Sequence, residues 1–200
     1  MIAIADYGMG NRRSVEKALE HVGATVARTA DAGAIAAADA IVLPGVGAFP
    51  EAMRNLRRTG LDEVLKELTQ PLLGICLGMQ LLFESSTEHE GAPGLGILPG
   101  TVTRLESPRL PHIGWNLVTF ERESVLGREL TEAAFYHVHS FACRPADPHD
   151  VVGTSEYGER FVSVVERDNV MASQFHPEKS SRDGLRMLRN FAQLAAVAVA

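Results

Sequence analysis

The first half of the sequence alternates short apolar runs with segments of helical periodicity. The apolar runs are "IAIAD" (2–6), "ATVAR" (24–28), "AIVLPG" (40–45) and "PLLGIC" (71–76), and the clearest helical patterns between them are "SVEKALEHV" (14–22) and "LDEVLKEL" (61–68). Strands that are joined through helices need right-handed crossovers, which give a mainly parallel sheet covered on both faces. The alternation therefore predicts an α/β fold.

The second half of the sequence predicts antiparallel strands. Its extended runs follow one another at short spacing: "TVTRL" (101–105), "WNLVTF" (115–120), "AFYHVHSFAC" (134–143), "DVVGTSEY" (150–157), "FVSVVERD" (161–168) and "VMASQFH" (170–176). Only turns such as Tyr157-Gly158 and Asp168-Asn169 separate several of them. We therefore expect a mixed sheet that is mainly parallel, with additional antiparallel strands in the second half.

The C-terminal segment has the pattern of a helix. Ser180 and Asp183 resemble a capping box at its start. An apolar stripe follows at helical spacing, formed by Leu185, Leu188, Phe191 and Ala195. We expect this stripe to be buried.

Length and composition restrict the classes of protein that fit. Two hundred residues suit a single domain spanning residues 1–200, and no apolar run approaches the ~18 residues that a membrane span needs. The opening "MIAIADYGMGN" lacks the pattern of a secretory signal, so we expect a cytoplasmic protein without a membrane partner. Cys76 and Cys143 match no disulfide framework and are expected to be reduced. A net charge of -6 argues against a nucleic-acid partner.

The segment "DYGMGN" (6–11) follows the first predicted strand. Gly8-Met9-Gly10 is only the G-x-G part of a dinucleotide-binding loop, and Arg13 stands where the third glycine belongs. We therefore do not expect nucleotide binding. The segment still lies at the carboxyl end of a strand, where α/β sheets place ligand loops, so it can contact a substrate or a partner.

The stretch "GICLG" (74–78) is the strongest chemical signal in the sequence. Gly74 and Gly78 flank Cys76 two residues to either side, with an apolar strand before and the helical "MQLLFE" after. A residue at the tip of a strand-to-helix turn brings these flanking positions too close together for bulky side chains, which is the requirement of a nucleophile elbow. The start of a helix also favours a thiolate. The alternative interpretation is a cysteine that is an inert core residue.

A nucleophilic thiol needs a base and a group that orients the base. The segment "QFHPE" (174–178) offers His176 at the end of a strand and Glu178 two residues later. By itself this triplet also occurs by chance in surface loops. His137 and His139 alternate on one strand, but no third ligand accompanies them at a metal-binding spacing, so we expect neither a metal nor another cofactor.

An oxyanion formed at such a thiol needs backbone N–H donors. The segment "LPGVGAF" (43–49) leaves a strand through Gly45, Val46 and Gly47, whose backbone can bend to expose amides. An ordinary glycine-rich turn is the alternative interpretation of this segment.

Taken in order, "PGVGAF", "GICLGMQLLF" and "QFHPEKS" resemble the class I glutamine amidotransferase family, which has a Cys-His-Glu triad on a flavodoxin-like three-layer α/β core. More narrowly, "DYGMGN", "PHIGWN" (111–116), "VHS" (138–140) and "HPEKS" (176–180) resemble the glutaminase-subunit family of imidazole glycerol phosphate synthase, which acts in histidine biosynthesis. The similarity covers nearly the whole chain.

The resemblance implies a substrate and roles for particular residues. Cys76 would attack the side-chain amide of L-glutamine, and His176, oriented by Glu178, would protonate the departing ammonia. The oxyanion would be held by the backbone of residues 45–47 and by the amide of Leu77. The residues that would hold the rest of glutamine are Gln80, Glu88, His139, Ser140 and Phe141. A thioester would be hydrolysed to glutamate, and no metal is needed.

The resemblance also implies a partner, because nothing in this chain consumes ammonia. The similar enzymes dock onto a (β/α)₈-barrel cyclase as a heterodimer, so the interface would use Asn11, Trp115, Asn116 and Lys179. Ordinary structural alternatives remain: an exposed lysine at a helix start for Lys179 and a core position for the single tryptophan. Arg12, His137 and Phe141 depart from the residues usual in this family.

Three alternatives to this function stay open at the level of sequence. A class I amidotransferase that serves another synthase would share the chemistry. A cysteine peptidase or thioesterase would share the elbow and the triad but would need an open groove. A regulatory binding module would keep a triad-like surface without turnover.

Overall fold

The computed structural model describes residues 1–197 of the 200-residue chain. Its larger sheet has nine strands in the order β2-β1-β3-β4-β13-β12-β11-β8-β9, and a smaller sheet has the order β10-β7-β5-β6. The strands of the larger sheet are β1 (Ile2–Ala5), β2 (Val26–Thr29), β3 (Ala40–Gly45), β4 (Leu72–Cys76), β8 (His112–Phe120), β9 (Glu132–His139), β11 (Val151–Tyr157), β12 (Glu159–Arg167) and β13 (Val170–Ser173). Those of the smaller sheet are β5 (Phe83–Ser86), β6 (Ala92–Pro93), β7 (Leu98–Arg104) and β10 (Phe141–Pro145).

The larger sheet changes direction at β13. Strands β2, β1, β3, β4 and β13 are parallel, whereas β13, β12, β11, β8 and β9 pair antiparallel. The helices are α1 (Arg12–His21), α2 (Ala32–Ala36), α3 (Phe49–Thr59), α4 (Leu61–Lys66), α5 (Leu77–Leu81) and α6 (Ser181–Val197), with 3₁₀ turns η1 (Pro148–Asp150) and η2 (Pro177–Lys179). The predicted mixed α/β fold is confirmed.

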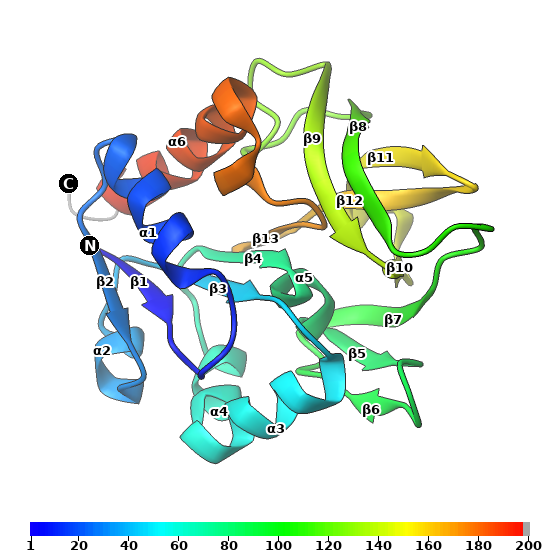
Figure 1. Ribbon diagram of the computed structural model, residues 1–200. Coiled ribbons are helices and arrows are strands. Elements are labelled where there is room, and N and C mark those ends of the chain that lie inside the picture. The colour runs from blue at the N-terminus through cyan, green and yellow to red at the C-terminus, as the bar shows by residue number, and fades with distance from the viewer. Residues whose placement is uncertain (198–200) are drawn as a thin grey trace.

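Two apolar layers cover the parallel strands. One side of the sheet packs with α1 and α6, and the other side packs with α3, α4 and α5 (Figure 1). Successive residues of β3 alternate between the two layers. Ile41 and Leu43 pack in the layer of α3, α4 and α5, and Val42 packs in the layer of α1 and α6. Side chains on successive strand residues point to opposite faces, so continuous apolar runs such as that of β3 are what a doubly covered sheet requires. No helix among the described residues combines the length and apolar character that crossing a bilayer takes.

One predicted strand differs in the structure. The run 134–143 is divided at Ser140: β9 pairs with β8 in the larger sheet, and β10 pairs with β7 in the smaller sheet. The run is uniformly extended in sequence because it crosses from one sheet to the other without a turn. This crossing places residues 139–141 between the two sheets, beside the end of β4.

The predicted capping box at α6 is wrong. The hydroxyl of Ser180 donates to the carbonyl of His176 (2.6 Å) and accepts the N–H of Tyr136 (3.0 Å). Ser180 is therefore used to join η2 to β9 rather than to cap the helix. The apolar stripe of α6 is confirmed at Leu188, Phe191 and Ala195, which are buried, whereas Leu185 is half-buried.

Candidate active site

Cys76 occupies a sharp turn between β4 and α5. Its backbone has φ 56° and ψ −111°, which is left-handed and strained for a residue with a side chain. A Cβ added at Gly78 would lie 1.8 Å from the carbonyl oxygen of Leu43, and one added at Gly74 would lie 3.0 Å from the backbone of Gly78. Only glycine fits at these two positions. The turn geometry predicted from "GICLG" is thus present.

His176 and Glu178 follow β13 and form a buried pair. His176 Nδ1 lies 2.9 Å from Glu178 Oε1, and both side chains are almost completely enclosed. The backbone N–H of His176 donates to the carbonyl of Tyr136 on β9 (3.0 Å). The ring is therefore held from two sides, through its own backbone and through the carboxylate.

The sulfur of Cys76 adjoins the ring of His176. Burial lowers the pKa of His176, but hydrogen bonding and attraction to Cys76 and Glu178 outweigh burial and raise this pKa to about 10. His176 Nε2 has no hydrogen bond of ordinary geometry within the described residues, so this nitrogen is available to a reacting group. The thiol, imidazole and carboxylate proposed from sequence are brought together in the order that nucleophilic catalysis requires.

Gln174 is a neighbour of the sulfur that the sequence analysis did not single out. Its Nε2 lies 3.9 Å from Cys76 Sγ, and the carbonyl of Val138 lies 3.9 Å from the same sulfur. Gln80 Nε2 donates to Gln174 Oε1 and to the carbonyl of Phe141, each at 3.1 Å. The amide of Gln80 is thus fixed by its own chain, which orients the side chain at the pocket. The place of Gln174 two residues before His176, at the end of the same apolar run, is the one sequence signal that could have indicated it.

A pocket of about 510 Å³ opens at Cys76. The predicted residues that line it are Val46, Gly47, Cys76, Leu77, Gln80, Glu88, His139, Ser140 and Phe141. Gly45 does not line the pocket but lies against the elbow, because a Cβ there would be 2.7 Å from the backbone nitrogen of Gly78. One carboxylate oxygen of Glu88 accepts the N–H of Phe49 (2.7 Å), which holds this acid at the pocket wall.

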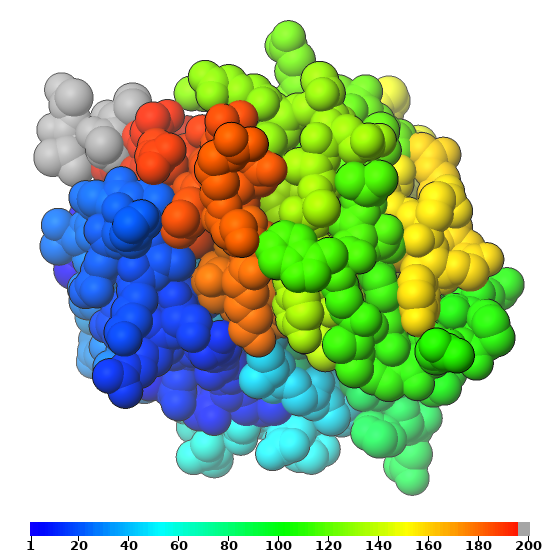
Figure 2. Space-filling view, turned by 45° about the horizontal axis from the view of Figure 1, so that its top comes forward, coloured from blue at the N-terminus to red at the C-terminus, as the bar shows by residue number. Residues whose placement is uncertain are grey.

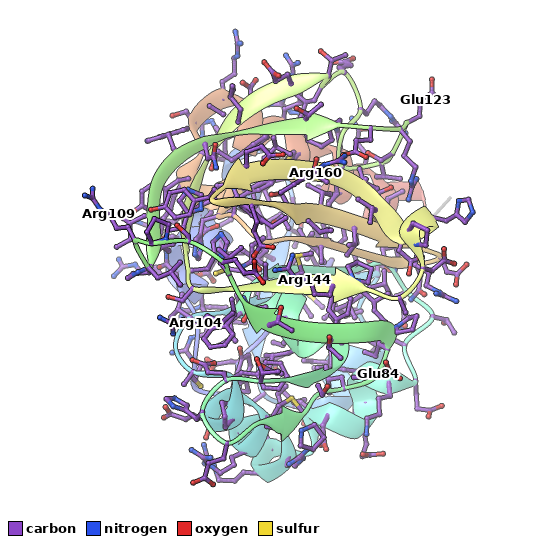
Figure 3. The ribbon with its side chains drawn as sticks, turned by 90° about the vertical axis from the view of Figure 1, so that its right-hand side faces the viewer. Glu84, Arg104, Arg109, Glu123, Arg144 and Arg160 are labelled. Atoms are coloured by element: carbon purple, nitrogen blue, oxygen red, sulfur yellow. The ribbon has the colours of Figure 1, made fainter. Side chains whose placement is uncertain are left out.

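Arg104 also lines the pocket, and the sequence analysis missed it. It is the last residue of β7, an inner strand of the smaller sheet that lies between β10 and β5 (Figure 3). No carboxylate of the described residues lies within salt-bridge distance of its guanidinium. A free cation beside a thiol pocket can bind an anionic group of a ligand.

The loop after β3 is anchored by Tyr7 from the segment "DYGMGN". The Tyr7 hydroxyl donates to the carbonyl of Pro44 (2.7 Å), and burial together with the nearby Cys76 raises the pKa of Tyr7, so the hydroxyl remains a donor. Gly45 is paired in register with Cys76, and Gly47 has φ 109°. The predicted oxyanion loop therefore begins directly beside the thiol.

Three histidines meet behind the pocket. His112 on β8 is the register partner of His139 on β9, and His137 lies two residues before His139 on the same strand. All three rings are buried. Sequence spacing does not reveal a third ligand for His137 and His139, because that ligand lies on the neighbouring strand β8. The third imidazole is supplied by His112.

Trp115 and Lys179, two of the predicted interface residues, lie on one surface, whereas the side chain of Asn116, which follows Trp115 on β8, points to the opposite face. Trp115 is 54% exposed, and its ring lies 6.5 Å from that of Tyr136; Lys179 Nζ lies 5.8 Å from the same tyrosine ring. In Figure 2 the green residues of β8 lie beside the orange segment around η2. Asn11 immediately precedes α1, which contacts η2. Asn116 is half-buried and donates to the carbonyl of Glu156 (2.9 Å), so its amide binds its own chain.

Comparison with known proteins identifies the family. The model of the glutamine amidotransferase class-I family matches residues 3–194. The chain belongs to the class I glutamine amidotransferases.

Relatives of this amidotransferase chain are similar over nearly their whole length. It is 50% identical to the "Imidazole glycerol phosphate synthase subunit HisH" of Moorella thermoacetica, over 96% of this chain and 94% of that protein. It is also 50% identical to the protein of the same name from Aquifex aeolicus, over 96% of each. A solved glutamine amidotransferase structure has a TM-score of 0.78 at 20% identity and covers 98% of both chains, which shows the shared flavodoxin-like fold.

Proposed function

We propose that this chain is the glutaminase subunit of imidazole glycerol phosphate synthase and that residues 1–200 form one amidotransferase domain. The observation that carries the proposal is the strained turn that presents the sulfur of Cys76 to the buried His176–Glu178 pair at the mouth of a pocket. The relatives of about half identity share the name of this subunit. A class I amidotransferase for another synthase is the alternative, and the names of these relatives disfavour it.

The proposed reaction proceeds through a thioester. The thiolate of Cys76 attacks the side-chain amide carbon of glutamine, and the carbonyl oxygen takes up the negative charge. His176, as imidazolium, gives its proton to the amide nitrogen, which leaves as ammonia. Water then adds to the thioester while His176 takes up its proton, and glutamate leaves as the Cys76 thiolate reforms. The proton count is the same at the start and at the end of the cycle.

The oxyanion donors are the backbone N–H of Leu77 and the loop of residues 45–47. Removing one such donor costs about 3 kcal/mol of transition-state stabilisation in enzymes of this chemistry. The flexible Gly45-Val46-Gly47 backbone can turn a peptide N–H toward the developing charge. We propose that ligand binding to the partner sets this orientation, so that glutamine is hydrolysed when ammonia can be used.

The rest of glutamine is held by the pocket wall. Gln80 and Glu88 face the pocket and suit the α-amino group, and the backbone of residues 139–141 receives the α-carboxylate. Arg104 adds a cation to the same wall, so we include it among the groups that attract the carboxylate.

The partner that consumes the ammonia is a (β/α)₈-barrel cyclase. The face around Trp115 and Lys179 suits this partner, because Lys179 has no carboxylate of its own chain within salt-bridge distance among residues 1–197. Its ammonium is free to pair with a carboxylate of the cyclase. The open end of the glutaminase pocket would then face the barrel.

The test is glutamine hydrolysis by the wild type and by Cys76→Ala, each with and without the cyclase and its nucleotide ligand. We expect ammonia and glutamate from the wild type, stimulation by the liganded cyclase, and loss of at least about 10³-fold in turnover in the variant. Wild-type turnover in Cys76→Ala would refute the mechanism. Hydrolysis of peptides or thioesters, with no ammonia from glutamine, would instead support a peptidase or thioesterase.

A further inference from the structure

The cluster of His112, His137 and His139 has no role in the glutaminase chemistry. One nitrogen from each ring lies within 4.8 Å of the nitrogens of the other two. The ring centroids are separated by 4.9 Å, 5.2 Å and 5.4 Å. Three imidazoles that bind one tetrahedral metal ion at ~2.0–2.1 Å have their centroids about 5 Å apart. A hydrogen-bonded pair of histidines would bring two rings together and leave the third ring farther away. The three centroid separations are similar here, which indicates a common centre.

The protons of the three rings cannot satisfy all their nitrogens. His139 Nδ1 lies 2.9 Å from the carbonyl of Phe141, so this nitrogen carries the proton and donates it. His139 Nε2 then has a single lone pair, which is approached by His137 Nδ1 at 3.2 Å and by His112 Nδ1 at 3.4 Å. One lone pair accepts one good hydrogen bond. The other approaching nitrogen is left without a proper partner.

A buried nitrogen in the cluster has no partner at all. His137 is 0% exposed, and its Nε2 has no hydrogen bond within the described part of the chain. An unpaired buried polar atom is unfavourable, commonly by about 1–3 kcal/mol, so the ligand-free cluster is not a satisfied core network. A cation held by His139 Nε2 and by Nδ1 of His112 and His137 accepts all three lone pairs at once and removes the conflict at His139 Nε2, whereas His137 Nε2 lies outside this donor set.

We propose that His112, His137 and His139 bind one divalent transition-metal ion, with Zn²⁺ as the ion that this set suits best. Imidazole nitrogens favour zinc over calcium or magnesium, which prefer oxygen ligands. The hydrogen bond from His139 Nδ1 to a backbone carbonyl is the support that metal-binding histidines generally have. The N···N distances of 3.2 Å and 3.4 Å to His139 match the edge of about 3.3 Å in tetrahedral zinc sites, so small ring rotations complete the set.

The fourth ligand and the ion itself reach this site through the glutamine pocket. His139 lines that pocket, and Pro111, the neighbour of His112, lines it as well. Three neutral imidazoles leave the charge of the ion uncompensated, so water or a carboxylate from the pocket completes its coordination.

Zn²⁺ binding to the full-length chain, freed of metal with a chelator, tests the proposal. Titrations against a competing chromophoric chelator would compare the wild type with His137→Phe, which keeps a ring of similar size. Cys76→Ala removes the thiol that adjoins His176, and His149→Ala, at an exposed histidine, is the matched control. We expect one equivalent of Zn²⁺ in the wild type, Cys76→Ala and His149→Ala, and at least ~100-fold weaker binding in His137→Phe.

The opposite result would overturn the site. If Cys76→Ala loses the ion and His137→Phe keeps it, the ion lies at the catalytic pair. A second measurement needs no variant: in wild-type protein with ¹⁵N-labelled histidine, Zn²⁺ should shift the ring signals of His112, His137 and His139 and leave that of the fourth buried histidine, His176, in place. Shifts confined to His176 or to exposed histidines, or no binding, would also refute the proposal. The titration reads binding alone, so its outcome is independent of whether the chain hydrolyses glutamine.

Discussion

At the scale of single residues, the candidate active site depends on backbone contacts that leave no room for side chains. Cys76 has a left-handed backbone, which costs roughly 1–3 kcal/mol for a non-glycine residue. The surroundings enforce it, because Gly78 packs against the carbonyl of Leu43 and Gly45 packs against the backbone nitrogen of Gly78. The ends of β3 and β4 are thus in direct backbone contact, and the side chain at the tip of the turn has to project into the pocket.

The Glu178 carboxylate should control the protonation of His176. In the wild type the pKa of His176 is raised to about 10 from its ordinary value of 6.5, so the imidazolium persists through neutral pH. Burial lowers this pKa, and Cys76 and Glu178 raise it through hydrogen bonding and attraction. Glu178→Gln removes the contribution of the carboxylate and leaves that of Cys76. We expect the titration midpoint of His176 to fall by at least about one pH unit, measured by NMR of the histidine ring signals.

The same change should alter the dependence of stability on pH. A raised pKa in the folded state contributes stability that is fully present below pH 6.5 and is lost as pH rises through about 10. Glu178→Gln should reduce this loss, seen as a flatter free energy of unfolding between these pH values. Glu63→Gln, which alters an exposed carboxylate on α4, is the control. An unchanged midpoint in Glu178→Gln would show that the carboxylate does not govern the imidazole.

At the scale of elements, the candidate triad is assembled at the ends of neighbouring strands, and β9, the edge strand of the larger sheet, supports it. β4 lies between β3 and β13, so the turn after β3, the elbow after β4 and the segment after β13 emerge side by side. The antiparallel strands then return β9 to the same place, where Tyr136 binds the backbone of His176 and the hydroxyl of Ser180. The edge strand of the larger sheet is thereby covered by the segment that carries His176.

Ser180 should act as a positioning residue for His176. In Ser180→Ala the N–H of Tyr136 loses its partner in a buried region, so we expect a loss of about 1–3 kcal/mol in the free energy of unfolding. The imidazole loses one of its anchors, so kcat for glutamine should fall by more than KM changes. Ser163→Ala removes a buried hydroxyl hydrogen bond of 2.8 Å to Ser155 and leaves the hydrogen bonds of His176 in place, so it is the matched control. If both variants lower kcat equally, the effect comes from stability and not from position.

Much of this arrangement could be predicted from sequence because it rests on local patterns. The parallel strands follow from continuous apolar runs, and the turn at Cys76 follows from glycines at fixed offsets. Glycine spacing encodes a backbone approach directly, which is why "GICLG" predicted the geometry found. Ser180 was assigned to a helix cap because the capping pattern is also local, and a tertiary hydrogen bond to β9 took its hydroxyl instead.

The remaining features depend on strand register and on the crossing between sheets. His112 meets His139 because β8 and β9 pair with these residues opposite each other, and a shift of one residue would have separated them. Arg104 reaches the pocket because β7 belongs to the smaller sheet, next to β10. Neither relation has a signature in sequence, since both are set by contacts between segments far apart in the chain.

At the scale of the whole molecule, the outer face of β8 is unusual for an exposed antiparallel strand. Ile113, Trp115 and Leu117 alternate along it and are 60%, 54% and 52% exposed, whereas His112 and Val118 point inward. The solvent face of such a sheet is ordinarily polar. A contiguous apolar stripe on an exposed face is typical of an interaction surface, and this one continues through Tyr136 to Lys179.

Trp115 should therefore be an anchor for the proposed cyclase. Its ring is half exposed and rests edge-on against Tyr136, so Trp115→Ala should leave the fold intact while removing a large apolar contact from the centre of the stripe. Tryptophan truncations at interface centres commonly cost about 2 kcal/mol or more, so we expect the Kd for the cyclase to rise at least ~30-fold. Isothermal titration of the two purified subunits measures this, with Lys66→Ala on the distant α4 as the control. A half-exposed ring of this size cannot be buried in a tight interface without contributing to affinity. An unchanged Kd in Trp115→Ala, with a thermal transition like that of the wild type, would therefore place the cyclase on another face.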